Sequence, residues 1–287
     1  MLKEDTRHGD PRQIPLHALG DTPVPWLFVK RILSDGRSEM RSDPHRDDYY
    51  MIVLITAGEA TVSVDFKDLV ISAGEAVLVS PAQIHAPSAA TGGVEGWLLA
   101  IASEHFSEQE AELAARYSLN PAAVRLSRDD AADAETLFGI LTRHSGSYPV
   151  AIPLAESIKR IILHSLSAGV PRRDDRYVSI VVRLKELLAG NLVSEKKPSA
   201  YAAMLNLSPV YLNEAVRAVT GKSAGSFIRG QIVLRAKRQL VYTSLSAQEI
   251  AFGLGYDDYA YFSRMFKKET GLSPTQYRKT LKNTSNS

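Results

Sequence analysis

The chain has 287 residues, of which 45% are hydrophobic and 23% charged, and it contains no cysteine. That length accommodates two domains of ordinary size. The lack of cysteine excludes disulfides, thiolate metal sites, iron–sulfur clusters and cysteine nucleophiles. No apolar run reaches about 18 residues, so we expect no membrane span. Residues 1–25 are polar and carry charges of both signs, so we expect no secretory signal.

The net charge of +2 is unevenly distributed along the chain. Residues 168–176 mix Gly, Pro and charged side chains, a composition typical of a linker. Residues 1–170 contain 15 Lys and Arg against 23 Asp and Glu, whereas residues 171–287 contain 19 against 9. We therefore predict an acidic domain over 1–170 and a basic domain over 171–287. The basic balance fits a polyanion such as DNA, the alternative being a solvated basic surface.

The acidic half begins with patterns of short β-strands. Apolar or alternating stretches cover residues 51–56, 61–66, 69–71, 76–79 and 93–102. In the second of these, alternation puts Val62, Val64 and Phe66 on one face. Gly58 and Gly74 lie in turn-forming sequences between the stretches. Short strands at this spacing predict an antiparallel barrel or sandwich.

This region resembles the cupin fold, a small jelly-roll barrel. The two cupin motifs correspond here to His45, Asp47 and Gly58, and to Gly74, Pro81 and His85. In cupin enzymes these motifs carry a metal-binding set of histidines and a glutamate. Here Asp47 stands where the second histidine of the first motif would be, and the glutamate position falls near the apolar Met51.

The incomplete ligand set makes us expect no metal, although two imidazoles and a carboxylate can form a facial triad. We expect His45 and His85 to hydrogen-bond at the mouth of the barrel or to touch a ligand. The predicted small-molecule effector site consists of His45, Tyr49, His85 and Trp97. Such a pocket would be concave and mostly apolar with a few polar groups.

Helical patterns follow the strands. Ser107 and Glu110 have the spacing of a capping box at the start of one helix. Further helices are predicted over 129–143 and 152–166, the latter with an apolar stripe at helical spacing. The stripe is either core or a dimer face.

The basic half contains one motif twice. In the second copy, Gly255 follows the small Ala251 by four residues and suits a left-handed helix end. Asp257 or Asp258 can cap the next helix, predicted over 259–270. The pattern is that of a helix-turn-helix.

The first copy lies fifty residues upstream. Asn206 takes the place of the glycine, four residues after Ala202, and asparagine tolerates the left-handed conformation. Ser208 can cap a helix over 209–220, with Pro209 at its first position. A helix over 224–242 lies between the copies and is about 28 Å long. As a spacer, this helix is long enough to place two recognition helices in successive major-groove segments, which are about 34 Å apart on one face of DNA.

Residues 177–282 resemble the AraC/XylS family of bacterial transcription regulators. The family signature is filled by Ile250, Ala251, Leu254, Gly255, Tyr256 and the run 261–278. The resemblance implies a regulator that binds double-stranded promoter DNA, is usually a homodimer, and is often controlled by a small-molecule effector in its barrel. We further expect RNA polymerase as a partner and a cytoplasmic, nucleoid-associated location. Because the metal-ligand set is incomplete and no other catalytic motif is present, we expect no enzyme activity and no cofactor. The alternative is a cupin-type metal-dependent enzyme fused to a DNA-binding domain.

The resemblance assigns base-contacting positions on both recognition helices. They are Val210, Asn213, Glu214 and Arg217 on the first, and Tyr259, Ala260, Ser263, Arg264 and Lys267 on the second. Arginine pairs with guanine and asparagine with adenine in bidentate contacts. The expected phosphate contacts are Lys267, Lys268, Arg278 and Lys279. Glu214 departs from the family, which frequently has arginine there, so base reading by the first helix is left open.

The expected fold class is therefore α+β. An antiparallel β-barrel of the cupin-like jelly-roll type comes first and is followed by helices. An all-α domain with two helix-turn-helix units completes it.

Overall fold

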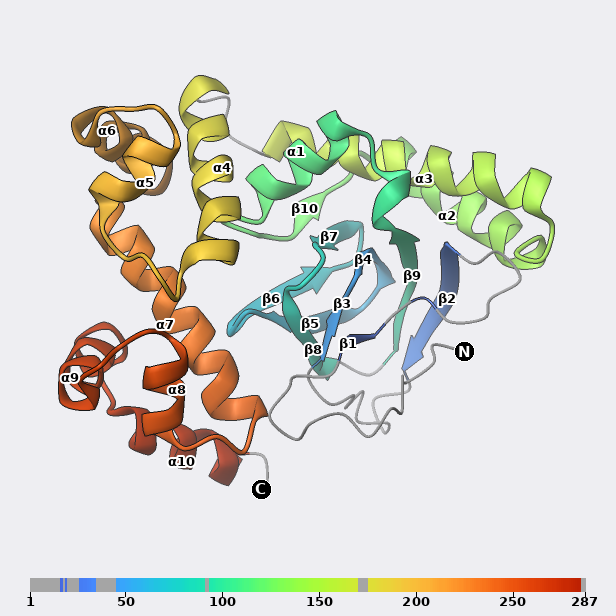
Figure 1. Cartoon of the computed structure of the whole chain (residues 1–287). Coiled ribbons are helices and arrows are strands. Elements are labelled where there is room, and N and C mark those ends of the chain that lie inside the picture. The colour runs from blue at the N-terminus through green and yellow to red at the C-terminus, as the bar shows by residue number, and fades with distance from the viewer. Residues whose placement is uncertain are drawn as a thin grey trace. The chain divides into compact units, whose positions relative to one another are not determined.

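The computed structural model describes residues 16–17, 19, 26–34, 45–90, 93–169 and 175–284. These residues form two compact units, one up to residue 169 and one from residue 175 (Figure 1). The central residues of the expected linker, 170–174, lie outside the described ranges. The first unit contains the strands, and the second consists of helices.

Two five-stranded sheets make up the β part of the first unit. One has the order β1-β3-β8-β5-β6 and the other β10-β7-β4-β9-β2. The strands are β1 (Leu16–His17), β2 (Leu27–Ser34), β3 (His45–Asp47), β4 (Tyr49–Ala57), β5 (Glu59–Val64), β6 (Lys67–Ser72), β7 (Glu75–Val79), β8 (Ile84–Ala90), β9 (Val94–Ala102) and β10 (Val124–Arg125). β1 and β3 are parallel, and the long strands pair antiparallel. The predicted antiparallel β architecture is confirmed.

The turns between strands explain one difference from the expected pattern. Val62 and Val64 are buried, as alternation predicts. Phe66, however, lies in the turn between β5 and β6, with a φ of 65°, next to Asp65 with a φ of 51°. Two successive left-handed residues reverse the chain tightly, as hairpin turns require. The prediction that Phe66 shares a strand face with the two valines is therefore wrong.

The strands alternate between two apolar layers. From β4, Met51, Val53 and Ile55 enter one cluster of buried side chains together with residues of β5 and β6 from the other sheet. Ile52 and Leu54 point to the opposite face and belong to a second cluster. This alternation follows from the two-residue period of a strand.

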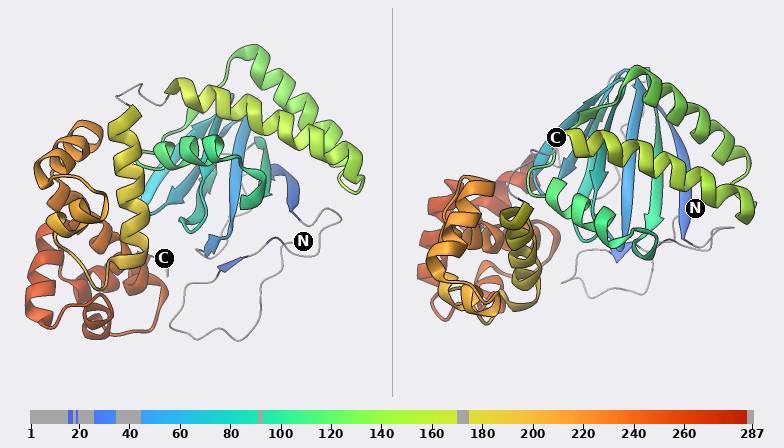
Figure 2. Two further views of the ribbon diagram at one scale, coloured as in Figure 1. Left: turned by 45° about the horizontal axis from the view of Figure 1, so that its top comes forward. Right: turned by 90° about the horizontal axis from the view of Figure 1, so that it is seen from above.

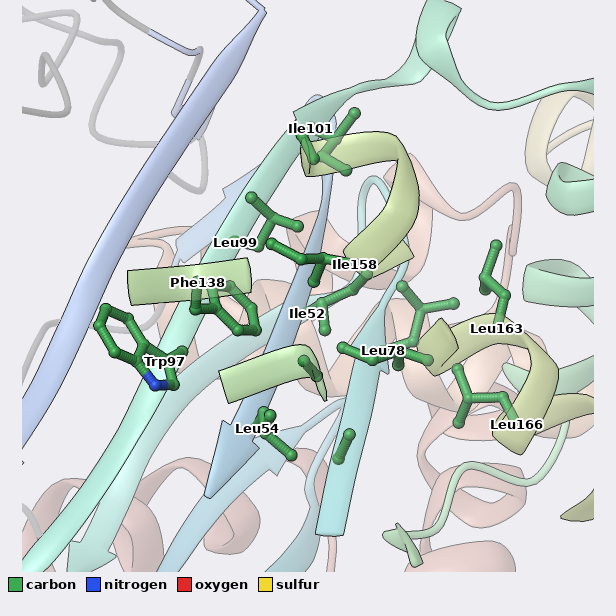
Figure 3. Close-up of a cluster of buried hydrophobic side chains, with 14 of the residues drawn as sticks. Ile52, Leu54, Leu78, Trp97, Leu99, Ile101, Phe138, Ile158, Leu163 and Leu166 are labelled. Atoms are coloured by element: carbon green, nitrogen blue, oxygen red, sulfur yellow. The ribbon is translucent and has the colours of Figure 1, made fainter. Parts of the chain in front are cut away.

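Three helices cover one face of the sheet that contains β4, the face on which Ile52 and Leu54 lie. They are α1 (Glu108–Tyr117), α2 (Arg128–Arg143) and α3 (Tyr148–Gly169), with the 3-10 turn η1 (Ser103–His105) before them. Figure 2 shows α2 and α3 running side by side over the strands. Figure 3 shows side chains of the strands and of α3 in contact, with Ile52 and Leu78 facing Ile158. The predicted stripe on α3 is thus largely core, since Ile158, Ile162 and Leu166 are buried.

The helix start at Ser107 is as predicted. Its hydroxyl accepts from the Glu110 N–H, and the Glu110 carboxylate accepts from the Ser107 N–H at 2.8 Å. This capping box satisfies two backbone donors at the start of α1. No helix among the described residues combines the length and apolarity that crossing a membrane requires.

The second unit consists of α4 (Asp175–Asn191), α5 (Pro198–Met204), α6 (Pro209–Thr220), α7 (Ala224–Tyr242), α8 (Ala247–Gly253), α9 (Tyr259–Thr270) and α10 (Pro274–Thr284). The bounds of α6, α7 and α9 match the predicted ones. Asn206 and Gly255 have φ of 57° and 72°, so both adopt the expected left-handed conformation. Ser208 and Asp258 cap α6 and α9 as expected.

Candidate DNA-binding surface and barrel site

The first helix-turn-helix is formed by α5 and α6. Leu212 and Val216 on α6 are fully buried and pack the helix onto the unit. The opposite side carries Val210, 78% exposed, together with the exposed Glu214 and Arg217. An amphipathic helix with this separation leaves one full face available for a partner.

Asn213 does not lie free on that face. It is half-buried, and its Oδ1 accepts from the backbone N–H of Ala224 at 3.0 Å, at the start of α7. Adenine is read by asparagine through both its oxygen and its NH₂ group. With the oxygen engaged, Asn213 holds two helices together, and in this arrangement the bidentate contact is not available to it.

Glu214 is anchored by a residue that the sequence did not single out. The Tyr177 hydroxyl on α4 donates to Glu214 Oε1 at 2.9 Å, and the Tyr177 ring meets Tyr211 edge-on at 5.7 Å. The carboxylate is therefore held in place on the surface of α6. Tyr177 comes from outside the helix-turn-helix, so no local spacing indicates its role.

The second helix-turn-helix is formed by α8 and α9. Phe262 and Phe266 are fully buried, and Asp258 Oδ1 accepts from the Ala260 N–H at 2.7 Å. The exposed members of the predicted set on α9 are Ala260, Arg264, Lys267 and Lys268. They follow one another at the spacing of a single helix face. Tyr259 and Ser263 are half-buried at its edge.

Arg278 contacts the backbone of its own unit. Its guanidinium is half-buried and donates to the carbonyl oxygen of Leu240 at 2.7 Å and to that of Leu245. Burial lowers the pKa of Arg278. The group thus satisfies carbonyls at the end of α7 and the following loop, and the expected phosphate contact of Arg278 stays a prediction. Lys279 is exposed, consistent with such a contact.

The first unit brings three of the four predicted effector residues together. His45 on β3 and His85 on β8 are directly opposite in the antiparallel pair, and their rings lie 4.5 Å apart edge to face. Asp47 stands between them, its oxygens 3.7 Å from His45 Nε2 and 3.2 Å from His85 Nε2. Tyr49 is 2% exposed, and burial together with the Asp47 charge raises its pKa.

Trp97 is not part of this group. Its side chain lies in the cluster beneath the helices and stacks on Phe138 of α2, with ring centroids 5.4 Å apart (Figure 3). His45, Asp47 and His85 belong to the other sheet. The prediction that Trp97 belongs to the effector site with the histidines is therefore wrong, because its strand turns this side chain into the helix-covered core.

Two family models match the chain. One, described as an AraC-like ligand binding domain, matches residues 31–147, and the other, described as a helix-turn-helix domain, matches residues 201–280. The HTH-type transcriptional activator RhaR of Salmonella dublin is 28% identical over 138 residues, which are 47% of this chain and 49% of that protein. The RhaR of Salmonella typhi is 27% identical over the same share. The chain spans about half the length of the curated relatives it matches.

Solved structures of related chains show weaker overall likeness. The C-terminal domain of AraT, a response regulator from Geobacillus stearothermophilus, is 36% identical with a TM-score of 0.33, covering 35% of this chain and 84% of that one. ToxT from Vibrio cholerae is 15% identical with a TM-score of 0.43, covering 88% and 95%. Both TM-scores are low, so these structures carry no conclusion about what this chain binds.

The two family models together match more than half of the chain, and they agree with its two compact units. The chain therefore belongs to the AraC/XylS family, with an AraC-like ligand-binding domain followed by a helix-turn-helix domain.

Proposed function

We propose that this chain is a transcription regulator that binds double-stranded promoter DNA through α6 and α9. The observation that carries the proposal is the repetition of one unit: each helix begins at a capped N-terminus, ends at a left-handed glycine and keeps one exposed polar face. Each fits the way in which a recognition helix enters the major groove. The helix α7, about 28 Å long, spaces the two units.

The two helices would contribute differently to sequence reading. On α9, Arg264 and Lys267 are exposed and offer donors to guanine, while Tyr259, Ala260 and Ser263 line the same surface. Lys268 would contact phosphate and strengthen binding without reading sequence.

On α6, Val210 and Arg217 remain available for base contacts. Glu214 is an acceptor suited to cytosine N4, although Tyr177 already occupies one of its oxygens. Asn213 would support α6 from behind rather than read a base. We therefore expect α9 to dominate specificity.

The first unit would be the regulatory part. We propose domains at 1–170 and 171–287, with a small-molecule effector bound near His45, Tyr49 and His85. An effector changes DNA affinity only if it binds two states of the protein with different affinity. The relatives are transcriptional activators, which favours a regulator without enzyme activity over a metal-dependent enzyme.

Three further features belong to the proposal. The regulator would act as a homodimer, for which half-buried apolar side chains such as Leu154 and Ile161 on α3 offer contact area. It would work in the cytoplasm on the nucleoid and would contact RNA polymerase. Light scattering on the purified full chain tests the dimer: a mass of one chain across micromolar concentrations contradicts it.

Selection of duplexes from a random pool by the full-length chain tests DNA reading. We expect enriched sequences with two elements about 10–10.5 base pairs apart. Titrations then compare the selected duplex with a scrambled one. Arg143→Ala, at an exposed position in the last turn of α2, serves as the control for loss of a surface arginine. Failure to enrich any sequence, or equal affinity for the selected and scrambled duplexes, contradicts the proposal.

A further inference from the structure

The strongest cluster of possible metal ligands in the described residues is formed by His45, Asp47 and His85, of which the two histidines also belong to the proposed effector site. One ligand atom from each lies within 4.8 Å of the others. The pairing of β3 with β8 sets His45 directly opposite His85. Asp47 is two residues further along β3, so it emerges on the same face as His45. Strand pairing therefore brings His45 and Asp47 close to His85, which is about forty positions later in the sequence.

The hydrogen bonding of His85 orients its ring. Its Nδ1 lies 3.2 Å from the carbonyl oxygen of Gln83. A carbonyl oxygen only accepts, so Nδ1 carries the hydrogen and, in the neutral ring, Nε2 is a bare lone pair. That lone pair points toward Asp47 Oδ2 at 3.2 Å. Two acceptors at this distance repel one another unless a cation lies between them.

Burial strengthens the need for a cation between Asp47 and His85. Asp47 and His85 are each only 3% exposed. Among the described residues, His85 Nε2 has no hydrogen-bond partner, and the Tyr49 hydroxyl interacts with the Asp47 carboxylate. A hydroxyl does not neutralise a buried carboxylate, and buried charges are normally paired or bound to a metal. Two imidazoles and one carboxylate thus converge on one buried point.

We propose that His45, Asp47 and His85 bind one divalent first-row transition-metal ion. Ligands at about 2.0–2.2 Å from a tetrahedral zinc lie roughly 3.3–3.6 Å from each other. The two separations between imidazole nitrogen and carboxylate oxygen, 3.7 Å and 3.2 Å, lie around that value. Two imidazoles and a carboxylate suit zinc, iron, cobalt or nickel better than calcium or magnesium.

The surroundings fit such an ion. The contact between His85 Nδ1 and the Gln83 carbonyl is the kind of outer hydrogen bond that fixes a metal-binding histidine. The replacement of a motif histidine by Asp47 keeps a ligand in that place and adds a negative charge. The apolar Met51 contributes nothing, which explains why the sequence alone argued against a metal. This site does not depend on the proposed DNA binding.

Metal loading of the untagged full-length chain tests the proposal. The protein is stripped with a chelator, mixed with Zn²⁺ or Co²⁺, separated from free ion, and measured for metal per chain. We expect one ion per chain and a visible Co²⁺ absorption band. Affinity for Zn²⁺ is then measured by competition with a coloured chelator, without DNA.

Variants locate the ion. Asp47→Asn keeps the shape of the side chain, and His85→Gln removes one nitrogen ligand. Loss of an outer partner alone lowers metal affinity about 10–100-fold, so each variant should lose at least that much. His144→Gln, at an exposed histidine, should match the wild type. Far-UV circular dichroism checks folding, and His45→Gln replaces any variant that fails to fold.

Two outcomes overturn the proposal. One is a wild-type chain that takes up neither Zn²⁺ nor Co²⁺. The other is unchanged affinity in both folded ligand variants, which moves the ion elsewhere. Promoter binding has no part in either readout, so the two proposals fail independently.

Discussion

Lys196 donates its ammonium to the carbonyl oxygen of Gly255 at 2.9 Å, across 59 positions in the sequence. It also donates to Val193 at 2.9 Å and lies 4.9 Å from the centre of the Tyr256 ring. Burial lowers the pKa of Lys196, with the charge of Glu195 opposing this effect. The loop before α5 is thereby attached to the turn of the second helix-turn-helix. This contact helps hold the two helix-turn-helix units in one arrangement.

The turn at Gly255 has no room for a side chain. A Cβ there would clash with the Val193 carbonyl oxygen, whereas at Gly271 it would meet nothing within 4 Å. Both glycines are left-handed, so Gly271→Ala should cost about 1–2 kcal/mol of unfolding free energy. Gly255→Ala should cost roughly 3–5 kcal/mol because backbone must also move. Urea unfolding followed by circular dichroism measures both. Equal losses of unfolding free energy in the two variants would show that the loop containing Val193 can move away without cost.

Asn213 should matter for stability rather than for base reading. Asn213→Ala removes the acceptor for the Ala224 N–H and should lower the free energy of unfolding by about 1 kcal/mol. Asn213→Asp keeps an acceptor and should restore most of that loss. The ratio of affinities for specific and scrambled duplexes should stay within about twofold in Asn213→Asp. A drop of about 1–3 kcal/mol in discrimination would instead assign adenine reading to Asn213.

Arg264 and Lys268 should separate sequence reading from phosphate binding. Arg264→Ala should weaken binding to the specific duplex by about 1–3 kcal/mol and relax specificity at one base position. Lys268→Ala should weaken binding to all duplexes alike and reduce the salt slope by about 1. Gel-shift titrations at several salt concentrations measure both. If the two variants lose affinity equally on specific and scrambled duplexes, Arg264 does not read a base.

Glu110 should make the first unit sensitive to acid. Burial tends to raise its pKa, but the Ser107 N–H and the Lys159 ammonium outweigh burial and lower it. A carboxyl whose folded pKa lies below its unfolded value adds stability above the unfolded pKa, near 4.5, and loses it as the pH falls through the folded pKa. Lys159, only 2% exposed at its side chain, binds Glu110 at 3.0 Å.

Glu110→Gln should therefore destabilise the unit by about 1–3 kcal/mol at pH 7, while the difference from the wild type shrinks toward pH 3. Glu108→Gln, at an exposed position in the same turn, should change neither the stability at pH 7 nor its dependence on pH. Both tryptophans of the chain lie in the first unit, so their fluorescence reports its unfolding. A constant difference between Glu110→Gln and wild type across this range would contradict the assignment.

Much of the second unit was predictable because its signals are local. Ser208, Asn206 and Gly255 act on backbone groups within a few residues, and such short-range relations set where helices begin and end. Ser208 begins α6 and Asp258 begins α9 in this way, and the predicted bounds of both helices match the structure. The positions Arg264 and Lys267 on one exposed face also follow from helical periodicity alone.

Other features depended on contacts between distant segments. Trp97 faces the helices, Arg278 donates to a carbonyl near the end of α7, and Asn213 accepts from the Ala224 N–H at the start of that helix. His45, Asp47 and His85 are present in the sequence as separate motif positions, but the register between β3 and β8 makes them one site. The alternation of side chains along a strand shows that the strand has two faces, but it does not show whether a helix or another sheet packs against each face. The sequence by itself therefore determined the α+β class and the repeated helix-turn-helix unit, because their signals are local, whereas strand pairing and helix packing decided which side chains remain exposed.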